Sequence, residues 1–178
     1  MKNTLKLMLF ALLAFGMLAC GEKKLTQEDL KKAEQTLMEN GGNLDKEAAT
    51  AVAEKYCRFV KQNPDDATAP DWLFKALQIE VKLGESEKAI ALCDQLVKDY
   101  PTSEVIPAAL MLTASDVYDS QLHDLDKARA MYEKVISDYP DSEWAESAEK
   151  MIEFLGLTPE EILGKIVLSN MIEEEGEW

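Results

Sequence analysis

Two stretches of the sequence end in the same way: Leu96-Val97-Lys98-Asp99-Tyr100-Pro101 and Val135-Ile136-Ser137-Asp138-Tyr139-Pro140. In and before each ending, apolar residues recur at i, i+3, i+4, i+7, i+8 and i+11, which is the spacing of one face of an α-helix. The two stripes are Ala89, Leu92, Cys93, Leu96, Val97 and Tyr100, then Ala128, Met131, Tyr132, Val135, Ile136 and Tyr139. The sequence therefore predicts two equivalent amphipathic helices.

A third, weaker copy of this helix precedes the other two. Residues 52–64 keep most of the stripe and end on a proline, although Lys55 interrupts the apolar face. The terminal prolines Pro64, Pro101 and Pro140 lie 37 and 39 residues apart. This spacing suits a repeated helix–turn–helix unit of about 34 residues with short insertions.

Glycines and prolines divide the sequence into helix pairs. Gly84 is expected to end the first helix of the second unit as a left-handed cap. The first helix of the third unit is apolar nearly all round, which is typical of a helix with neighbours on several sides. The expected units are residues 26–40 with 44–62 across Gly41-Gly42, residues 70–83 with the helix that starts near Ser86, and about Ser103–Tyr118 with the stripe from Ala128.

The segments after two of the prolines share one plan, Thr102-Ser103-Glu104 and Asp141-Ser142-Glu143. Each offers a hydroxyl that can accept amide hydrogen bonds and an acid in the first turn, so each is expected to start a helix. Further on, Thr158-Pro159-Glu160-Glu161 forms a capping box. We expect the helix of residues 159–173 to pair with the helix that stops at Gly156 and to close the open end of the stack.

The charge of the chain limits its partners. The 178 residues include 19 basic and 34 acidic side chains, and the formal net charge is -15. Such a surface repels phosphate backbones and anionic headgroups, so we expect no nucleic-acid partner. Disorder is disfavoured because 47% of the residues are hydrophobic and recur with a helical period.

The N-terminal residues are typical of an export signal. Lys2 and Lys6 supply positive charge, and the stretch from Leu5 to Leu18 is otherwise apolar; at about 14 residues it is too short to span a bilayer comfortably. The segment Met17-Leu18-Ala19-Cys20-Gly21 resembles the lipobox of bacterial lipoproteins, in which the cysteine is acylated and becomes the mature N-terminus. The resemblance implies a cleaved signal peptide (1–19), a lipid-anchored linker (20–25) and a helical domain (26–178). The alternative is an ordinary cleaved signal with an incidental cysteine.

The repeated helices resemble the tetratricopeptide repeat family. The matching positions are the small Ala89 and Ala128, the bulky Tyr56 and Tyr132, Gly84, and the three terminal prolines. The Tyr-Pro endings are similar to those of envelope repeat proteins, among them the lipoprotein subunit of the β-barrel assembly machinery and the periplasmic coordinator of cell division. The resemblance implies an all-α, right-handed superhelical solenoid of antiparallel helix pairs, with about three repeats and a C-terminal capping helix pair.

No pattern of catalytic or metal-binding residues stands out, so we expect neither an enzyme nor a cofactor. His123, the only histidine, lies in a polar turn and is expected to be solvated. Cys57 and Cys93 have no CxxC spacing and are interpreted as small apolar residues. Asn43-Leu44-Asp45-Lys46-Glu47 is interpreted as a helix entry, because Ala48 stands where a calcium loop needs glycine.

The sequence thus favours a non-catalytic scaffold or adaptor that binds envelope proteins or peptides. One form of this hypothesis is an accessory of outer-membrane protein assembly. The alternative is a small-ligand binder or enzyme with an unrecognised pocket. Gly21 after Cys20 resembles lipoproteins sent to the outer membrane, so we expect a lipid-anchored protein facing the periplasm. In the repeat family, first helices line the concave groove. Transferred to this chain, the groove residues are Asp71, Phe74, Gln78, Met111 and Ser115, with Phe74 and Met111 either exposed for a partner or buried between units.

The first testable prediction concerns Cys20. Metabolic labelling with a radioactive fatty acid should mark the wild-type protein, because the lipobox interpretation makes Cys20 the acylated residue. The acyl chains should also hold the protein in the membrane, since each buried methylene contributes about 0.8 kcal/mol. The Cys20→Ala variant should lose the label and become soluble in the periplasm. A Cys20→Ala protein that remains labelled and membrane-bound would contradict the lipobox interpretation.

Overall fold

The structure is a computed structural model and describes residues 23–39 and 45–175. The predicted signal peptide, Cys20 and the turn Gly41-Gly42 lie outside the described residues. Within them all regular structure is helical, as predicted. The elements are α2 (Gln27–Glu39), α3 (Lys46–Gln62), α4 (Ala69–Lys82), α5 (Ser86–Asp99), α6 (Ile106–Leu112), η1 (Thr113–Gln121), α7 (Leu125–Asp138), α8 (Trp144–Phe154) and α9 (Pro159–Glu175).

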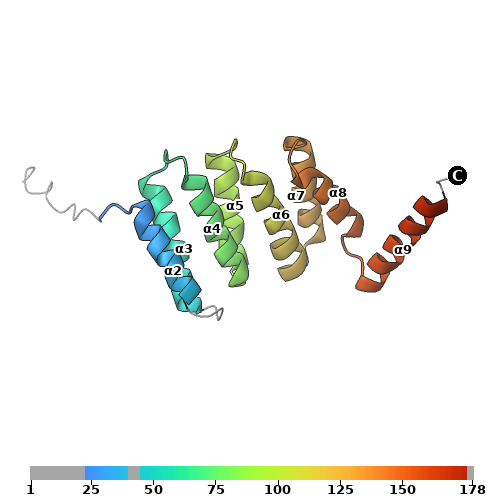
Figure 1. Cartoon of the computed structure of the whole chain (residues 1–178), viewed down its shortest axis with the longest axis horizontal. Helices are drawn as coiled ribbons and strands as arrows, with labels where there is room; N and C mark the ends of the chain where they lie inside the picture. Colours follow the sequence, from blue (N-terminus) through green and yellow to red (C-terminus); the bar gives the residue numbers. More distant parts are fainter. Residues whose placement is uncertain (1–22, 40–44, 176–178) are drawn as a thin grey trace, which may run out of the picture.

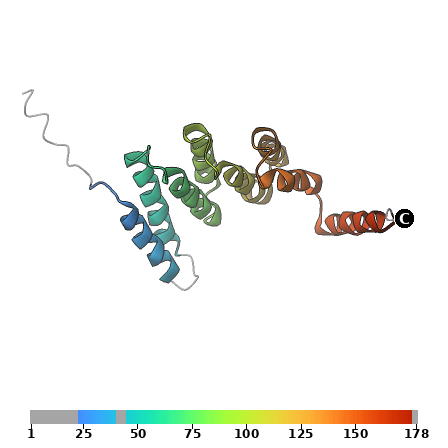
Figure 2. The ribbon, with the colours of Figure 1, turned by 45° about the horizontal axis from the view of Figure 1, so that its top comes forward.

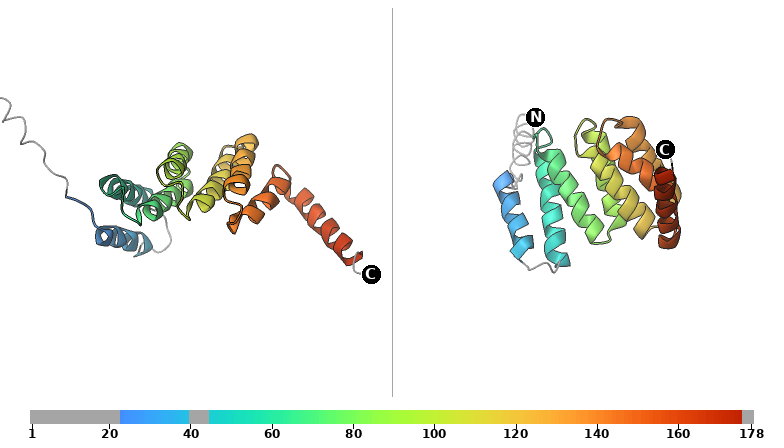
Figure 3. Two further views of the ribbon diagram at one scale, coloured as in Figure 1. Left: turned by 90° about the horizontal axis from the view of Figure 1, so that it is seen from above. Right: turned by 45° about the vertical axis from the view of Figure 1, so that its right-hand side comes forward.

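The helices stack as antiparallel pairs in two layers. In the view from above (Figure 3), α2, α4, α6 and α8 form one layer, and α3, α5 and α7 form the other. In the first three units each first helix packs against the second helix of its own unit, and α4 also packs against α3 of the unit before it. The chain is therefore a helical solenoid of the tetratricopeptide type, in which each unit buries its apolar face against its neighbours.

The first helices form the inner side of the stack. Between units, α4 packs against α6, and α6 against α8, whereas α3, α5 and α7 make no comparable contacts with one another among the described residues. In a curved stack the layer whose helices lie closer together is the inner one. The concave side is therefore made by α4, the helix α6–η1 and α8.

The residues that carry the repeat pattern are buried, as predicted. Ala89 and Ala128 are completely buried on α5 and α7, and so is Tyr132. Tyr56 is also buried, and its ring centroid lies 5.1 Å from that of Trp72. These side chains belong to one continuous core that runs from α2 to α8.

Two tyrosines connect successive repeats through hydrogen bonds. The hydroxyl of Tyr100 donates to the carbonyl oxygen of Pro64 at 3.1 Å. One repeat further on, the hydroxyl of Tyr139 donates to the carbonyl oxygen of Pro101 at 3.4 Å. The Tyr100-Pro101 ending thus gives one residue that reaches back to the previous turn and one that receives the next tyrosine.

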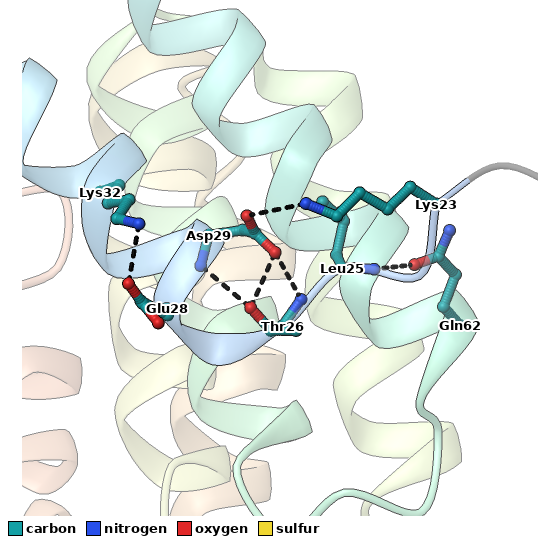
Figure 4. A network of polar contacts seen from close by, with 7 residues as sticks. All are labelled: Lys23, Leu25, Thr26, Glu28, Asp29, Lys32 and Gln62. Carbon is teal, nitrogen blue, oxygen red and sulfur yellow. Dashed lines mark hydrogen bonds and ion pairs between the residues drawn. The ribbon is translucent and has the colours of Figure 1, made fainter.

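The N-terminal segment is attached to the end of α3. Figure 4 shows the backbone amide of Leu25 donating to Oε1 of Gln62 at 2.8 Å, and Leu25 itself is buried. Next to it, the amide and hydroxyl of Thr26 both donate to Asp29, and the amide of Asp29 donates back to Thr26 Oγ1. This reciprocal arrangement satisfies amide groups at the start of α2.

A residue with a left-handed backbone conformation follows the first helix in three units. Gly84 has φ 71° and Gly156 has φ 78°, and His123 takes the position equivalent to Gly84 with φ 54°. The predicted cap at Gly84 is therefore confirmed. The predicted capping box is confirmed too, because the amide of Thr158 donates to Glu161 and the amide of Glu161 donates to Thr158 Oγ1.

The prediction that Ser103 and Ser142 cap the following helices is wrong. α6 begins three residues later than expected, at Ile106, and neither α6 nor α8 has a side-chain cap. The serines instead lie in turns, where their amides donate to the carbonyls of Tyr100 and Tyr139. The hydroxyl of Ser142 donates to Tyr139 as well, so it is occupied as a donor.

The first helix of the third unit starts as α6 and continues as the π-helix η1, which was not predicted. Pro107 and His123 are 16 residues apart, whereas the equivalent Pro70 and Gly84 are 14 apart. The two extra residues are accommodated in η1, where hydrogen bonds reach five residues back, as from the amide of Leu122 to the carbonyl of Val117. The helix therefore keeps its place between its neighbours despite the insertion.

The prediction that the last two helices form a capping pair is only half right. α8 packs against α7 and α6, but α9 makes no comparable contact with any described helix. Figures 1 and 2 show α9 extending away from the stack. Its apolar residues Leu163 and Leu168 are 62% and 59% exposed, because the turn at Gly156 and Leu157 directs α9 outward instead of back onto α8.

The close packing at Ala89 and Ala128 gives a stability prediction. Replacing either residue with leucine inserts a bulky group where no space exists and should lower the free energy of unfolding by about 1 to 3 kcal/mol. Ala91→Leu and Ala130→Leu are matched controls, because both alanines are exposed on the same two helices. Urea unfolding that shows equal stability for the buried and exposed variants would contradict the packing described.

Candidate protein-binding surfaces

Three of the predicted groove residues share one face of α4. Asp71, Phe74 and Gln78 follow at i, i+3 and i+7, a spacing that places them on one side of a helix. Asp71 and Gln78 are exposed, and Phe74 is half-buried against the core. Exposed polar side chains on either side of a partly exposed aromatic ring can contact a polypeptide through both hydrogen bonds and apolar area.

Met111 does not offer an exposed side chain. It is only 8% exposed and belongs to the core, so the alternative that it packs between units holds for this residue. The reason is its helix, since α6 packs against α5, α7 and α8. Ser115, one turn further on, is partly exposed, and its hydroxyl donates to Oδ2 of Asp116 at 2.6 Å.

The α4 face is bordered by an ordered basic residue. Nζ of Lys75 lies 2.6 Å from Oε1 of Glu34 on α2 and 4.5 Å from the centre of the Trp72 ring. The ion pair and the cation–π contact together hold this side chain toward α2. Lys75 therefore separates the exposed part of α4 from the first helix pair.

A second candidate surface lies on the edge formed by three turns. The turn edge comprises residues 63–68, 100–105 and 139–143, each joining a second helix to the next first helix. Two clefts open between successive turns. The first turn cleft, about 440 Å³, lies between the turns that contain Pro64 and Pro101, and the second, about 570 Å³, lies between those that contain Pro101 and Pro140. The repeated Asp-Tyr-Pro sequence was the available signal for these clefts, and sequence reasoning used it only to align the repeats.

A buried carboxyl lies at the opposite ends of the helices, near the turn after α4. Glu80 is 4% exposed, and its Oε2 accepts no hydrogen bond from the described residues. The nearest ammonium group is Lys88, 3.7 Å away. Burial raises the pKa of Glu80, the charge of Lys88 opposes that shift, and the carboxylates of Glu85 and Glu54 add to it. Glu80 is thus a buried carboxyl that belongs to neither candidate surface.

The two thiols are protected from reaction. Cys93 is buried and Cys57 half-buried, and both are free cysteines. Burial, followed by the charge of Glu80, raises the pKa of Cys57 to about 11, and burial also raises the pKa of Cys93. Because the thiolate is the reactive form, both residues act as apolar side chains at neutral pH.

Other polar candidates take structural positions. His123 is exposed in its turn, as predicted, with Nδ1 at 3.0 Å from the carbonyl oxygen of Asp119. Asp45 accepts hydrogen bonds from the amides of Glu47 and Ala48, so this segment is a helix entry, as interpreted. Among the residues that the structure describes, no three acidic, histidine or cysteine side chains converge in a way that could hold a metal ion.

These features define an all-helical repeat protein whose exposed surfaces suit polypeptide partners. Residues 74–103 and 108–142 match the family model described as tetratricopeptide repeat. Each matched segment contains most of a first helix, the whole second helix and part of the following turn. The comparisons found no match among curated proteins and none among solved structures.

The buried carboxyl gives a pH-dependent prediction. Because the pKa of Glu80 is raised in the folded state, the folded protein binds more protons than the unfolded chain above the ordinary value of 4.5. Stability should therefore fall as the pH rises through the folded pKa. Glu80→Gln removes this cost and should raise the free energy of unfolding at pH 7.5 by about 1 kcal/mol, with little effect at pH 4.

The neighbouring Glu85 is a control of opposite sign. Its hydrogen bond and ion pair with Lys46, at 2.8 Å, lower its pKa. Its contribution is present at neutral pH and is lost as the pH falls through the lowered folded pKa, so Glu85→Gln should not stabilise the protein. Urea unfolding between pH 4 and 8 measures both variants. A Glu80→Gln protein less stable than wild type at pH 7.5 would show that the Lys88 attraction outweighs burial.

Proposed function

We propose that the protein is a non-catalytic scaffold of the bacterial envelope that binds polypeptides on the concave side of its repeats. The observation that carries this proposal is the α4 face, where Phe74 is partly exposed between Asp71 and Gln78 on the inner layer. Tetratricopeptide repeats generally mediate protein–protein interactions, and two segments of the chain match that family. A stack of repeats offers a rigid, extended surface, which lowers the entropic cost of binding.

The envelope part of the proposal is supported by the N-terminal sequence. The lipobox-like segment around Cys20 favours an acylated protein at the outer membrane facing the periplasm. No helix in the described part of the chain is long and apolar enough to cross a membrane. A role as an accessory of outer-membrane protein assembly or of another envelope complex would agree with the Tyr-Pro endings, which are similar to those of envelope repeat proteins.

The alternative function is that of a small-ligand binder or an enzyme. The second turn cleft has a volume of about 570 Å³, which is large enough for a small molecule. The cleft is lined by carboxylates and hydroxyls together with Tyr139 and Trp144. Among the described residues, the hydroxyls of Ser142 and Tyr139 donate to backbone carbonyls and not to a carboxylate that could act as a base. We therefore favour the scaffold.

An affinity pull-down from solubilised envelopes tests the concave surface. The double variant Asp71→Lys and Gln78→Lys adds two positive side chains to exposed positions and should abolish capture of the concave-side partners. These substitutions are expected to leave the fold intact, because exposed surface changes usually alter stability by about 0.5 kcal/mol or less. Circular dichroism checks the fold of each variant.

The matched control is Asp94→Lys with Gln95→Lys. Both residues are exposed on α5, in the outer layer, so this variant carries the same change of residue types and charge. It should capture the same partners as the wild type. Equal loss in both variants would show that net charge controls binding, and unchanged capture in both would remove the α4 face as the working surface.

A further inference from the structure

The two turn clefts have equivalent walls in successive repeats. The first is lined by Tyr100 and Pro101 together with Asp65 and Asp99. The second is lined by Tyr139 and Pro140 together with acids at Glu104, Asp141 and Glu143. A binding feature that recurs with the repeat is suited to an extended occupant that passes from one unit to the next.

The tyrosine rings form a rigid part of each cleft. Both hydroxyls donate to the carbonyl of the preceding turn, Tyr100 to Pro64 and Tyr139 to Pro101. Each ring is therefore held at both ends between two turns, and each stays half-buried, with part of its surface open to the cleft. The second cleft adds the half-buried indole of Trp144 at the start of α8.

The charge of the clefts is one-sided. No lysine, arginine or histidine lines either cleft. Within the described residues, no ion pair joins Asp65, Asp99, Glu104, Asp141 or Glu143 to a base. In the first cleft the carboxylates lie close enough to the ring to act on it, since burial and then the charges of Asp99 and Asp65 raise the pKa of Tyr100. In the second cleft burial raises the pKa of Tyr139, and the charge of Lys134 opposes that shift. By contrast, Asp66 and Asp138 are occupied by Thr68 and Lys134.

We propose that the turn edge binds an extended, cationic segment of a partner polypeptide, with a lysine or arginine side chain in each cleft. An ammonium or guanidinium group there would be attracted by the carboxylates and by the faces of the tyrosine and tryptophan rings. The proline rings offer apolar area for the aliphatic part of the same side chain. The inference rests on the proposed scaffold function and assigns it a second surface, separate from the α4 face.

The binding test uses a synthetic peptide of five arginine–glycine repeats and the full chain without its signal peptide. Nuclear magnetic resonance should show shifts of the Trp144 indole and of the amides of Thr102 and Ser103 as the peptide is added. The corresponding glutamine–glycine peptide should cause none. Shifts that are spread over all acidic helices, or that are absent from the turns, would overturn the proposal.

A charge-neutralised variant tests the acids of the second cleft. Glu104→Gln, Asp141→Asn and Glu143→Gln together should weaken peptide binding about tenfold, because three exposed charge pairs that each contribute a little are lost at once. The matched control is Glu87→Gln, Asp94→Asn and Glu133→Gln, which removes the same charges from exposed positions on α5 and α7. The control should lose only about twofold.

The outcomes separate this inference from the proposed function. Equal weakening by the cleft variant and its control would mean general attraction to a chain of net charge -15, and would overturn the proposal. Unchanged pull-down of envelope proteins by a cleft variant that no longer binds the peptide would still support a second surface. If the α4 variant loses capture of envelope proteins, and neither the α4 variant nor the cleft variant changes peptide binding, the scaffold function is supported and the proposed role of the clefts is refuted.

Discussion

The stack depends on close contact between helices at positions where only small side chains fit. Ala89 and Ala128 are completely buried on α5 and α7, and Cys93 lies one turn from Ala89, with its Sγ 3.7 Å from the carbonyl oxygen of Ala109. This contact joins a second helix directly to the first helix of the next unit. No helix pair could bury its apolar face alone, so the same packing that forms one repeat also orients the next. The direction of the exposed α4 face and the spacing of the turns follow from it.

Polar contacts add order to this packing without replacing it. The hydrogen bonds of Tyr100 and Tyr139 each contribute about 1 kcal/mol at most, since both hydroxyls can bind water in the unfolded chain. Their larger effect is geometric, because they hold two aromatic rings between successive turns. The turn edge thereby combines rigid aromatic area with carboxylates that no ion pair joins to a base within the described residues, whereas the α4 face offers a ring between neutral and acidic side chains.

Most of the fold could be predicted from the sequence, because periodicity and turn chemistry act locally. The stripe from Ala89 and the cap at Gly84 each depend on a few neighbouring residues. The π-helix η1 could not be predicted, although the spacing of 39 instead of 37 residues signalled an insertion, because the length alone does not say whether a helix widens or a loop grows. The burial of Met111 and the outward direction of α9 are tertiary facts, set by which neighbours reach each helix. Met111 was therefore wrongly included among the possible groove residues. The clefts were not predicted, because each is formed by two turns that lie 37 to 39 residues apart in the sequence.

The attachment of the N-terminal segment relates the proposed lipid anchor to the turn edge. Leu25 is held by Gln62 at the end of α3, and Nε2 of Gln27 donates to Thr68 Oγ1 at 3.1 Å, in the first of the three turns. Five residue steps from Cys20 to Leu25 span at most about 18 Å. If Cys20 is acylated as proposed, Leu25 would lie within that distance of the bilayer surface, and the first turn of the edge lies next to Leu25. Anionic headgroups would repel its acids, so the edge would stay free of the membrane and available to a cationic segment that leaves the bilayer nearby.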